Sequence, residues 1–307
     1  MAPDAPPDEG ERTRGALNTR RQKSGVRYVS FLSGGIARPG LLEGDLVRPL
    51  PARIPSLLDY VTLAPAERAA LELQAPIPLS NLTLAAPVRP HKNVVCVGRN
   101  YMGHAEEVAR ASGKPLNLPS VPTFFTKAPT AISDPGATLR LSAAVSSEYD
   151  WEAELAVVIG ARCRDVPEET ALEAVFGYAC LNDVTARDLQ RAHQQWFKGK
   201  SLDGTCPLGP WIVGADEIGD PQTLEISLRL NGETKQRAST STMIFSVRKV
   251  IASLSRGMTL EPGDVIATGT PDGVGFARTP PEFLKDGDVL EVEIERIGVL
   301  RNTIVLR

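Results

Sequence analysis

Short strand-like segments separated by tight turns dominate the chain from about residue 91 onward, and they constrain its fold more than any other feature. Their apolar residues alternate with polar ones or form short runs, and Gly-Asp turns at Gly263 and Gly287 precede two of them. The segments are PTFFTKAP, TLRL, WEAELAVVIG, GPWIVG, LEISLRLNG, GDVIATG and DVLEVEIERIG. Helical spacing is clearest at roughly 167–174, 185–193 and 247–255. This pattern predicts a mixed, β-rich α+β domain of closed or folded-over sheets and argues against a doubly wound parallel sheet.

A smaller unit precedes this domain. Residues 25–85 contain strand patterns in VRYVSFL and LLEGDLVRPL, followed by helical spacing in PSLLDYV and LAPAERAALELQ. Four prolines between residues 76 and 90 indicate a linker, so we expect the main domain over 91–307. Residues 1–24 are polar and rich in Pro and Arg, which predicts a flexible tail and no targeting signal.

Charge and cysteine content narrow the classes of partner. With 34 basic and 37 acidic residues, the chain offers no basic footprint for nucleic acid or anionic lipid. No apolar run reaches the roughly 18–20 residues that a membrane span needs. Four cysteines without a CxxC pair predict reduced thiols and a cytoplasmic protein, and three histidines are few for a His-rich metal site. We therefore expect a small-molecule partner and a site built from carboxylates.

Four carboxylates run into one apolar strand in SSEYDWEAELAVVIG. A two-residue period places Glu148, Asp150, Glu152 and Glu154 on one face of that strand. A solvated acidic face is the ordinary interpretation of such alternation, because exposed carboxylates cost little. However, the LAVVIG run that follows suggests burial on both faces, and adjacent half-buried carboxylates need a cation or raised pKa values. A divalent metal satisfies that need.

A third carboxylate, Asp183, follows the apolar run FGYACLN. Taken alone, Asp183 is best interpreted as the cap of the next helix, which carries Arg187 and Gln190 on one face. At the end of a buried strand, it would instead complete an oxygen-rich site suited to Mg²⁺ or Mn²⁺.

The segment GRNYMGHAEE places His104 and Glu107 three residues apart, on the same side of a helical turn. A carboxylate orients an imidazole and raises its basicity, which gives a general base for water. An exposed surface pair on a Gly-rich loop is the alternative. The glycines around this pair are typical of a loop that closes like a lid.

Two further segments are weak signals when taken singly. Lys198 and Lys200 in WFKGKSLDG are typical of solvated charge, and GDVIATGTPDGVG is typical of a tight turn after a strand. The second segment lacks the GK[ST] ending of a phosphate-binding loop, which argues against nucleotide binding.

Taken in order, these segments resemble the fumarylacetoacetate hydrolase family across nearly all of residues 91–307. The matching motifs are GRNYMGHAEE, FFTKAP, YDWEAELAVVIG, LNDVTARDLQ, GKSLDGTCPLGPWIV, LNGE, TLEPGDVIATGTPDGVG and FLKDGDVLEVEI. The segment before residue 80 resembles the small N-terminal domain of many short members. The resemblance implies a β-sandwich roll around a pseudo-barrel, assembled as a homodimer.

The resemblance also implies a role for each candidate residue. The implied ligands of Mg²⁺ or Mn²⁺ are Glu152, Glu154 and Asp183. The implied catalytic residues are His104 and Glu107 on the lid and Lys200, which would polarise the substrate. The implied substrate-binding residues are Arg187, Gln190 and Thr270. Glu148 and Asp150 match no family ligand, so we expect them at the surface or supporting the ligands.

The implied activity is metal-dependent hydrolysis of a C–C bond in a β-diketo acid of acylpyruvate or fumarylpyruvate type. His104, oriented by Glu107, would activate water, and the products would be pyruvate and a carboxylic acid. Family members also decarboxylate oxaloacetate-like acids or interconvert enol and keto forms, so these activities stay alternatives. The presence of both His104 and Glu107 favours hydrolysis or decarboxylation. We expect Arg110, Lys114 and residues 276–281 to contact the rest of the substrate.

Overall fold

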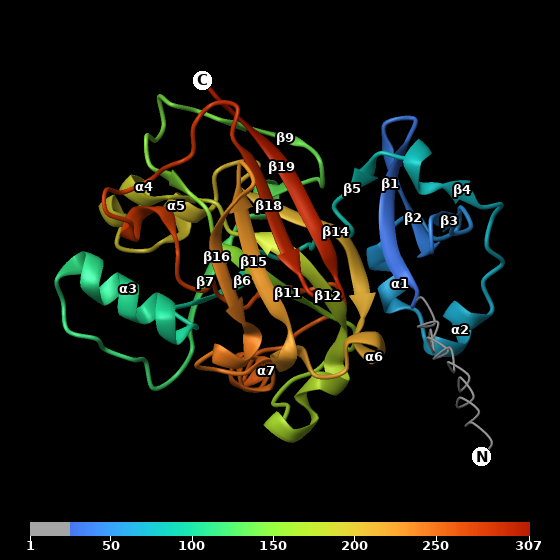
Figure 1. Ribbon diagram of the computed structural model, residues 1–307. Helices are drawn as coiled ribbons and strands as arrows, with labels where there is room; N and C mark the ends of the chain where they lie inside the picture. Colours follow the sequence, from blue (N-terminus) through green and yellow to red (C-terminus); the bar gives the residue numbers. More distant parts are fainter. Residues whose placement is uncertain (1–24) are drawn as a thin grey trace, which may run out of the picture.

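A computed structural model describes residues 25–307 and shows two packed sheets with short helices around them (Figure 1). The expected tail, residues 1–24, lies outside the described residues. The larger sheet has twelve strands, ten of them in one path. In spatial order that path is β4 (Ile77–Pro78), β3 (Leu46–Pro49), β2 (Ile36–Glu43), β1 (Arg27–Ser33), β14 (Cys206–Gly214), β12 (Val175–Asn182), β11 (Ala153–Ile159), β17 (Val265–Ala267), β6 (Val94–Gly98) and β7 (Thr123–Lys127). Two short strands lie outside this path: β5 (Leu84–Ala85) pairs with β1, and β8 (Ile132–Ser133) pairs with β14.

A second, five-stranded sheet packs on the first. Its order is β16 (Glu233–Ser239), β15 (Glu225–Leu230), β18 (Val289–Ile294), β19 (Gly298–Leu306) and β9 (Thr138–Leu141). A third, two-stranded sheet consists of β10 (Tyr149–Asp150) and β13 (Thr185–Ala186). The expected mixed, β-rich fold is confirmed, and the sheets of residues 25–307 remain open instead of closing into a barrel.

Strand β11 lies at the centre of the core. Leu155, Val157 and Ile159 pack into the cluster shared with the five-stranded sheet, whereas Ala156 and Val158 pack into the cluster on the opposite face. All seven residues of β11 are buried, as the apolar run LAVVIG predicted. A strand covered on both faces holds any polar side chain at its end in a dry environment.

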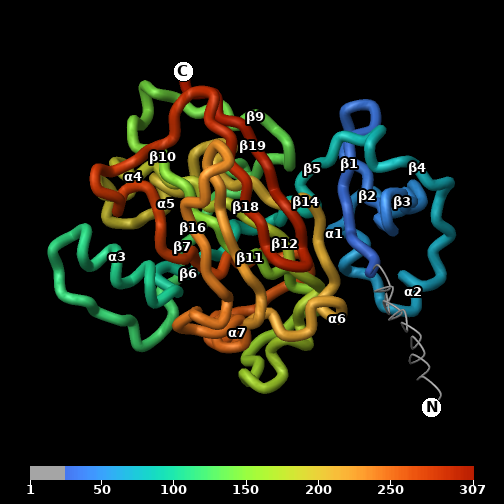
Figure 2. The backbone as a smooth tube through the Cα atoms, in the orientation of Figure 1, coloured from blue at the N-terminus to red at the C-terminus, as the bar shows by residue number. Residues whose placement is uncertain are grey.

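The leading segment adds its strands to the main sheet. Strand β1 pairs antiparallel with β14, with Tyr28 opposite Ile212. Helix α1 (Leu57–Thr62) buries Leu57 and Val61 in the same apolar cluster as Ala156 of β11. Figure 2 shows residues 25–85 on one side of the main body. The large sheet and this apolar cluster both contain residues from before position 85 and from after position 91. The expected boundary between two domains at 85–91 therefore stays a prediction.

The helices are short. They are α2 (Pro65–Ala69), α3 (Met102–Ser112), α4 (Arg187–Ala192), α5 (Phe197–Lys200), α6 (Ala215–Ile218) and α7 (Val247–Ser255). Single 3₁₀ turns are η1 (Leu79–Asn81), η2 (Pro129–Ala131), η4 (Pro221–Thr223), η5 (Thr240–Thr242) and η6 (Gly275–Ala277), and a longer 3₁₀ segment is η3 (Glu168–Ala174). Within residues 25–307, no helix has the length and apolar character to cross a membrane.

The expected helices differ from the structure in detail. The helix expected at 247–255 is confirmed as α7, whereas 167–174 forms a 3₁₀ helix, and 185–193 divides into β13 and α4. The expectation of a loop around His104 is wrong, because these residues form the eleven-residue helix α3 (Met102–Ser112). Its Ala, Glu and Arg residues favour a helix, and Gly113 ends it in the left-handed conformation at φ +65°.

Candidate active site

Three carboxylates meet where two central strands end. Glu154 lies in β11, Glu152 lies just before it, and Asp183 directly follows β12. Antiparallel pairing sets Ala153 opposite Asn182, so the start of one strand lies beside the end of the other. All three side chains are buried, and one oxygen of each lies within 4.8 Å of the others. This cluster is hereafter the carboxylate triad.

Two buried lysines are paired with the triad. Nζ of Lys200 lies 2.8 Å from Glu152 and 2.7 Å from Asp183. Nζ of Lys127 lies 2.7 Å from the other oxygen of Asp183 and donates to the carbonyl of Val184. The sequence motifs imply a role for Lys200 but none for Lys127. The only signal for Lys127 was a single charge at the end of the apolar strand FFTK.

The two glutamates of the triad differ in charge environment. Burial raises the pKa of Glu154, and the neighbouring Asp183 and Glu152 charges raise it further. Burial also opposes ionisation of Glu152, but Lys200, Arg187 and His104 outweigh it and hold the pKa of Glu152 below its usual value. Among the described residues, Glu154 has no ion-pair partner, and it accepts a hydrogen bond from the backbone N–H of Gly269 at 2.7 Å.

The donor set therefore fits a hard divalent cation. It offers carboxylate oxygens from three buried residues, and one of them, Glu154, forms no ion pair with a side chain of residues 25–307. A cation there would satisfy the charge of Glu154. The nearby Cys96 and Cys206 thiols are fully buried, and burial raises the pKa of each, which disfavours a thiolate ligand.

The His104–Glu107 pair is buried, although it lies on the peripheral helix α3. Nδ1 of His104 lies 2.7 Å from Oε1 of Glu107, and Oε2 of Glu107 accepts a hydrogen bond from the N–H of Gly273 at 2.8 Å. The exposed pair considered as an alternative is therefore wrong. The pair is held between α3 and the turn after Thr270, and the Nδ1 contact leaves Nε2 as the free ring nitrogen.

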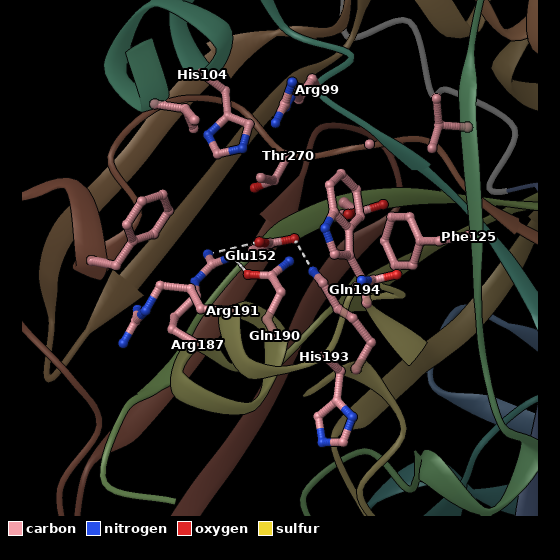
Figure 3. A pocket seen from close by; sticks show the side chains of 17 residues that line it. Arg99, His104, Phe125, Glu152, Arg187, Gln190, Arg191, His193, Gln194 and Thr270 are labelled. Carbon is pink, nitrogen blue, oxygen red and sulfur yellow. Dashed lines mark hydrogen bonds and ion pairs between the residues drawn. The ribbon is translucent and has the colours of Figure 1, made fainter. Parts of the chain in front are cut away.

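A cavity of about 400 Å³ joins these groups (Figure 3). The candidate residues that line it are His104, Glu152, Glu154, Arg187, Gln190, Lys200 and Thr270. Asp183 belongs to the triad that the cavity reaches, and Glu107 lies behind His104. The structure thus brings together all nine candidate residues, which the sequence spreads over more than 160 positions.

Arg187 is fixed by several contacts. Its Nε lies 2.8 Å from Asp150, a second guanidinium nitrogen lies 2.7 Å from Glu152, and Nη1 donates to Gln190. Asp150 also accepts hydrogen bonds from the N–H groups of Gly275 and Phe276. The guanidinium stands 4.4 Å from the centroid of the Phe276 ring. Arg187 is therefore held at the cavity wall by protein contacts before any ligand binds.

The expectation that four carboxylates share one strand face is wrong. Asp150 belongs to β10, which pairs with β13, whereas β11 begins only at Ala153. The chain turns between them, and the N–H of Glu152 donates to the side chain of Asn182. Glu148 lies at the surface in an ion pair with Arg191, as expected for a residue that matches no ligand.

The residues expected to contact the rest of the substrate are dispersed. Phe276 lines the main cavity, and Lys114 lines a smaller neighbouring cavity beside α3. Arg110 is exposed in the last turn of α3. Only the first of these three lines the cavity that reaches the triad.

A family model, curated relatives and solved structures all match this chain, and they agree on one protein family. Residues 93–305 match the fumarylacetoacetate (FAA) hydrolase C-terminal family. An oxaloacetate tautomerase of Bacillus subtilis is 48% identical over 74% of this chain and 74% of its own length. A mitochondrial oxaloacetate tautomerase of Bos taurus is 44% identical over 91% of this chain and 92% of its own length. The solved structure of a fumarylacetoacetate hydrolase from Exiguobacterium antarcticum is 41% identical, covers 92% of this chain and all of its own, and superposes with a TM-score of 0.78.

Proposed function

Because the chain belongs to the fumarylacetoacetate hydrolase family, we propose that it is a divalent-metal-dependent enol–keto tautomerase of a 2-oxo acid of the oxaloacetate type. The observation that carries the proposal is that one cavity is lined both by Glu152 and Glu154 of the buried carboxylate triad and by His104. Relatives that are 48% and 44% identical are named oxaloacetate tautomerases. They favour this activity over the hydrolysis that the sequence motifs placed first.

Glu152, Glu154 and Asp183 would hold Mg²⁺ or Mn²⁺, because both ions prefer oxygen ligands. When bound, the ion would supply Lewis acidity and a fixed orientation for the oxygens of a 2-oxo acid. Arg187 and Gln190 present hydrogen-bond donors from one face of α4, and Thr270 presents a hydroxyl from the turn after β17. These three residues would bind the substrate carboxylate beside the triad.

The tautomerisation moves one proton, from the enol hydroxyl to the neighbouring carbon, and His104 has the geometry to carry it. Its Nε2 has no hydrogen-bond partner within residues 25–307, Glu107 orients the ring through Nδ1, and the N–H of Gly273 donates to Glu107. Lys200, buried beside Glu152 and Asp183, would donate a hydrogen bond to the oxygen that carries negative charge between the two proton transfers.

Hydrolysis of an acylpyruvate or fumarylpyruvate is the second candidate. The observation that favours it is the same buried pair, because His104 supported by a carboxylate can also deprotonate a water molecule. C–C cleavage would then require that water to attack the distal carbonyl of the substrate.

One experiment separates these activities. Chelator-stripped protein is reloaded with Mg²⁺ or Mn²⁺ and incubated with enol-oxaloacetate and with a set of acylpyruvates, and NMR follows every product. We expect faster enol–keto exchange of oxaloacetate with no loss of carbon. Pyruvate with a second carboxylic acid from an acylpyruvate would instead establish the hydrolase, and pyruvate with carbon dioxide would establish a decarboxylase.

Assembly and location stay predictions. We propose a homodimer from the family resemblance, which light scattering of the purified protein would test. The four unpaired cysteines agree with a reducing compartment such as the cytoplasm. The Bos taurus relative is mitochondrial by name, so fractionation of the source cells is the deciding measurement.

A further inference from the structure

Arg99 stands at the edge of the active-site cavity on a rigid piece of backbone. It directly follows β6 and adopts the left-handed conformation at φ +56°, which is unfavourable for a residue with a Cβ. The next residue, Asn100, is fully buried and makes hydrogen bonds with Phe245 and with the carbonyl of Thr268. These contacts hold the backbone in place and set the direction in which the exposed Arg99 side chain leaves it.

The Arg99 side chain faces the cavity. It is part of the cavity wall, and Figure 3 shows it beside His104 and above Thr270. Its guanidinium carbon lies 5.9 Å from the centroid of the Trp196 ring, a cation–π distance that positions the charge without neutralising it. The smaller cavity beside α3 also touches Arg99.

The charges of the cavity wall distinguish Arg99 from the other cations. Lys and Arg residues line the cavity at positions 99, 187, 191 and 200. Arg187 pairs with Asp150 and Glu152, Arg191 pairs with Glu148, and Lys200 pairs with Glu152 and Asp183. Arg99 has no carboxylate partner within residues 25–307. Of the four cations of this wall, Arg99 is therefore the one whose charge no carboxylate of the described residues already neutralises.

From this geometry we infer that Arg99 binds the second carboxylate of a dicarboxylic 2-oxo acid and makes the enzyme select dicarboxylates over monocarboxylates. The inference rests on the proposed function, in which the triad, Arg187, Gln190 and Thr270 bind the first carboxylate and the 2-oxo oxygen. A guanidinium suits this role, because its planar donors pair with both oxygens of a carboxylate.

The test compares ligands that differ only at the distal carboxylate. Malate and 2-hydroxybutyrate are four-carbon acids with the same groups at C1 to C3. At C4, malate has a carboxylate and 2-hydroxybutyrate has a methyl group. Titration calorimetry with the full chain loaded with Mn²⁺ should show tighter binding of malate, by roughly 10- to 100-fold, since a hydrogen-bonded charge pair has about that effect. The variant Arg99→Gln should remove this preference, and Arg99→Lys should restore part of it.

Arg191→Gln is the matched control. Arg191 is an exposed cation of the same wall, but Glu148 already pairs with it, so the preference for malate should persist. Equal affinities of the wild type for the two ligands, or no binding of malate, would overturn the inference. A preference that survives Arg99→Gln would also overturn it.

A kinetic measurement distinguishes failure of this inference from failure of the proposed function. Enol–keto exchange is compared for oxaloacetate and its C4 methyl ester, and Arg99→Gln should raise KM for the diacid alone. If the wild type exchanges neither compound, the proposed function fails and the calorimetry still tests Arg99. If it exchanges both and Arg99→Gln changes them equally, the tautomerase stands and the role of Arg99 fails.

Discussion

Lys127 and Lys200 are almost completely buried, which is unusual for lysine unless the charge is paired. Both contact Asp183, one on each carboxylate oxygen, so this aspartate is the centre of the charge network. Burial lowers the pKa of Lys200, but Asp183 and Glu152 outweigh that effect and raise it above its ordinary value. The charged form of Lys200 is therefore favoured in the fold.

Removing Lys127 should destabilise the protein. The change Lys127→Met keeps a long side chain but leaves one oxygen of buried Asp183 without its partner. We expect the free energy of unfolding to fall by about 3–5 kcal/mol, as for other broken buried pairs. Urea denaturation of metal-free protein measures it, with exposed Lys198→Met as the control. Equal stabilities of the two variants would contradict the role of Lys127.

The His104–Glu107 pair makes a second prediction. Glu107→Gln places an amide where a carboxylate orients the imidazole, so turnover should fall by roughly 100- to 10,000-fold. Binding of Mn²⁺, followed by calorimetry, should stay as in the wild type, because Glu107 is not part of the triad. Glu106→Gln on the exposed face of the same helix is the control. Unchanged turnover in Glu107→Gln would exclude the pair from the mechanism.

At the scale of elements, the turn after β17 connects the carboxylate triad with helix α3. Gly269 donates to Glu154, Thr270 lines the cavity, and Gly273 donates to Glu107. A single turn thus supports both the triad and the His104–Glu107 pair. Gly269 has φ +96°, and a Cβ there would lie 2.8 Å from Cβ of Asn100 and 2.9 Å from the carbonyl oxygen of Val97.

The change Gly269→Ala should therefore act on the site as well as on stability. Gly257 is the control, since it is also left-handed at φ +72° but has open space around its Cβ position. Gly257→Ala should cost about 1 kcal/mol through backbone conformation alone. Gly269→Ala should cost roughly 1–3 kcal/mol more through the clash and should weaken Mn²⁺ binding. Equal effects of the two changes would show that the turn does not position Glu154.

At the scale of the whole molecule, the metal should be a major source of stability. The triad concentrates three carboxylates in a buried place, and burial together with Asp183 and Glu152 raises the pKa of Glu154 in the metal-free protein. A cation that binds only the folded chain at about 100 times its Kd adds about 2.7 kcal/mol to the free energy of unfolding.

The matching experiment is thermal unfolding of chelator-stripped protein with and without Mn²⁺. We expect Tm to rise with Mn²⁺ in the wild type and in Glu148→Gln, whose carboxylate lies at the surface. Glu154→Gln should not respond to Mn²⁺, although its metal-free form should unfold near the wild-type temperature, because the amide has nearly the size of the carboxyl group and its oxygen can still accept the hydrogen bond from the N–H of Gly269. A full response of Glu154→Gln would remove this residue from the ligands.

Elements that depend on local residue pattern follow from the amino-acid sequence alone. The period-two and apolar runs located β7, β9, β11, β14, β15 and β18, and the resemblance of the motifs to a known family supplied the nine candidate residues. Local residue pattern gives the wrong structure where contacts with residues distant in the sequence determine the conformation. The glycines around His104 favour a loop, whereas the structure has helix α3 there. The turn before β11 has no strong turn signal in the sequence, so the two-residue period places Asp150 on the same face as Glu154, whereas Asp150 lies in β10.

Which charged side chains lie close together depends on long-range packing. Lys127, Asp150 and Arg99 lie 33 to 88 residues from Asp183 and Arg187, and no spacing rule relates them. Strand pairing between β11 and β12, and the packing of the turn after β17 against α3, bring their side chains to one cavity. A buried charge depends on its nearest partner, and that partner is set by long-range packing, which a local pattern does not encode.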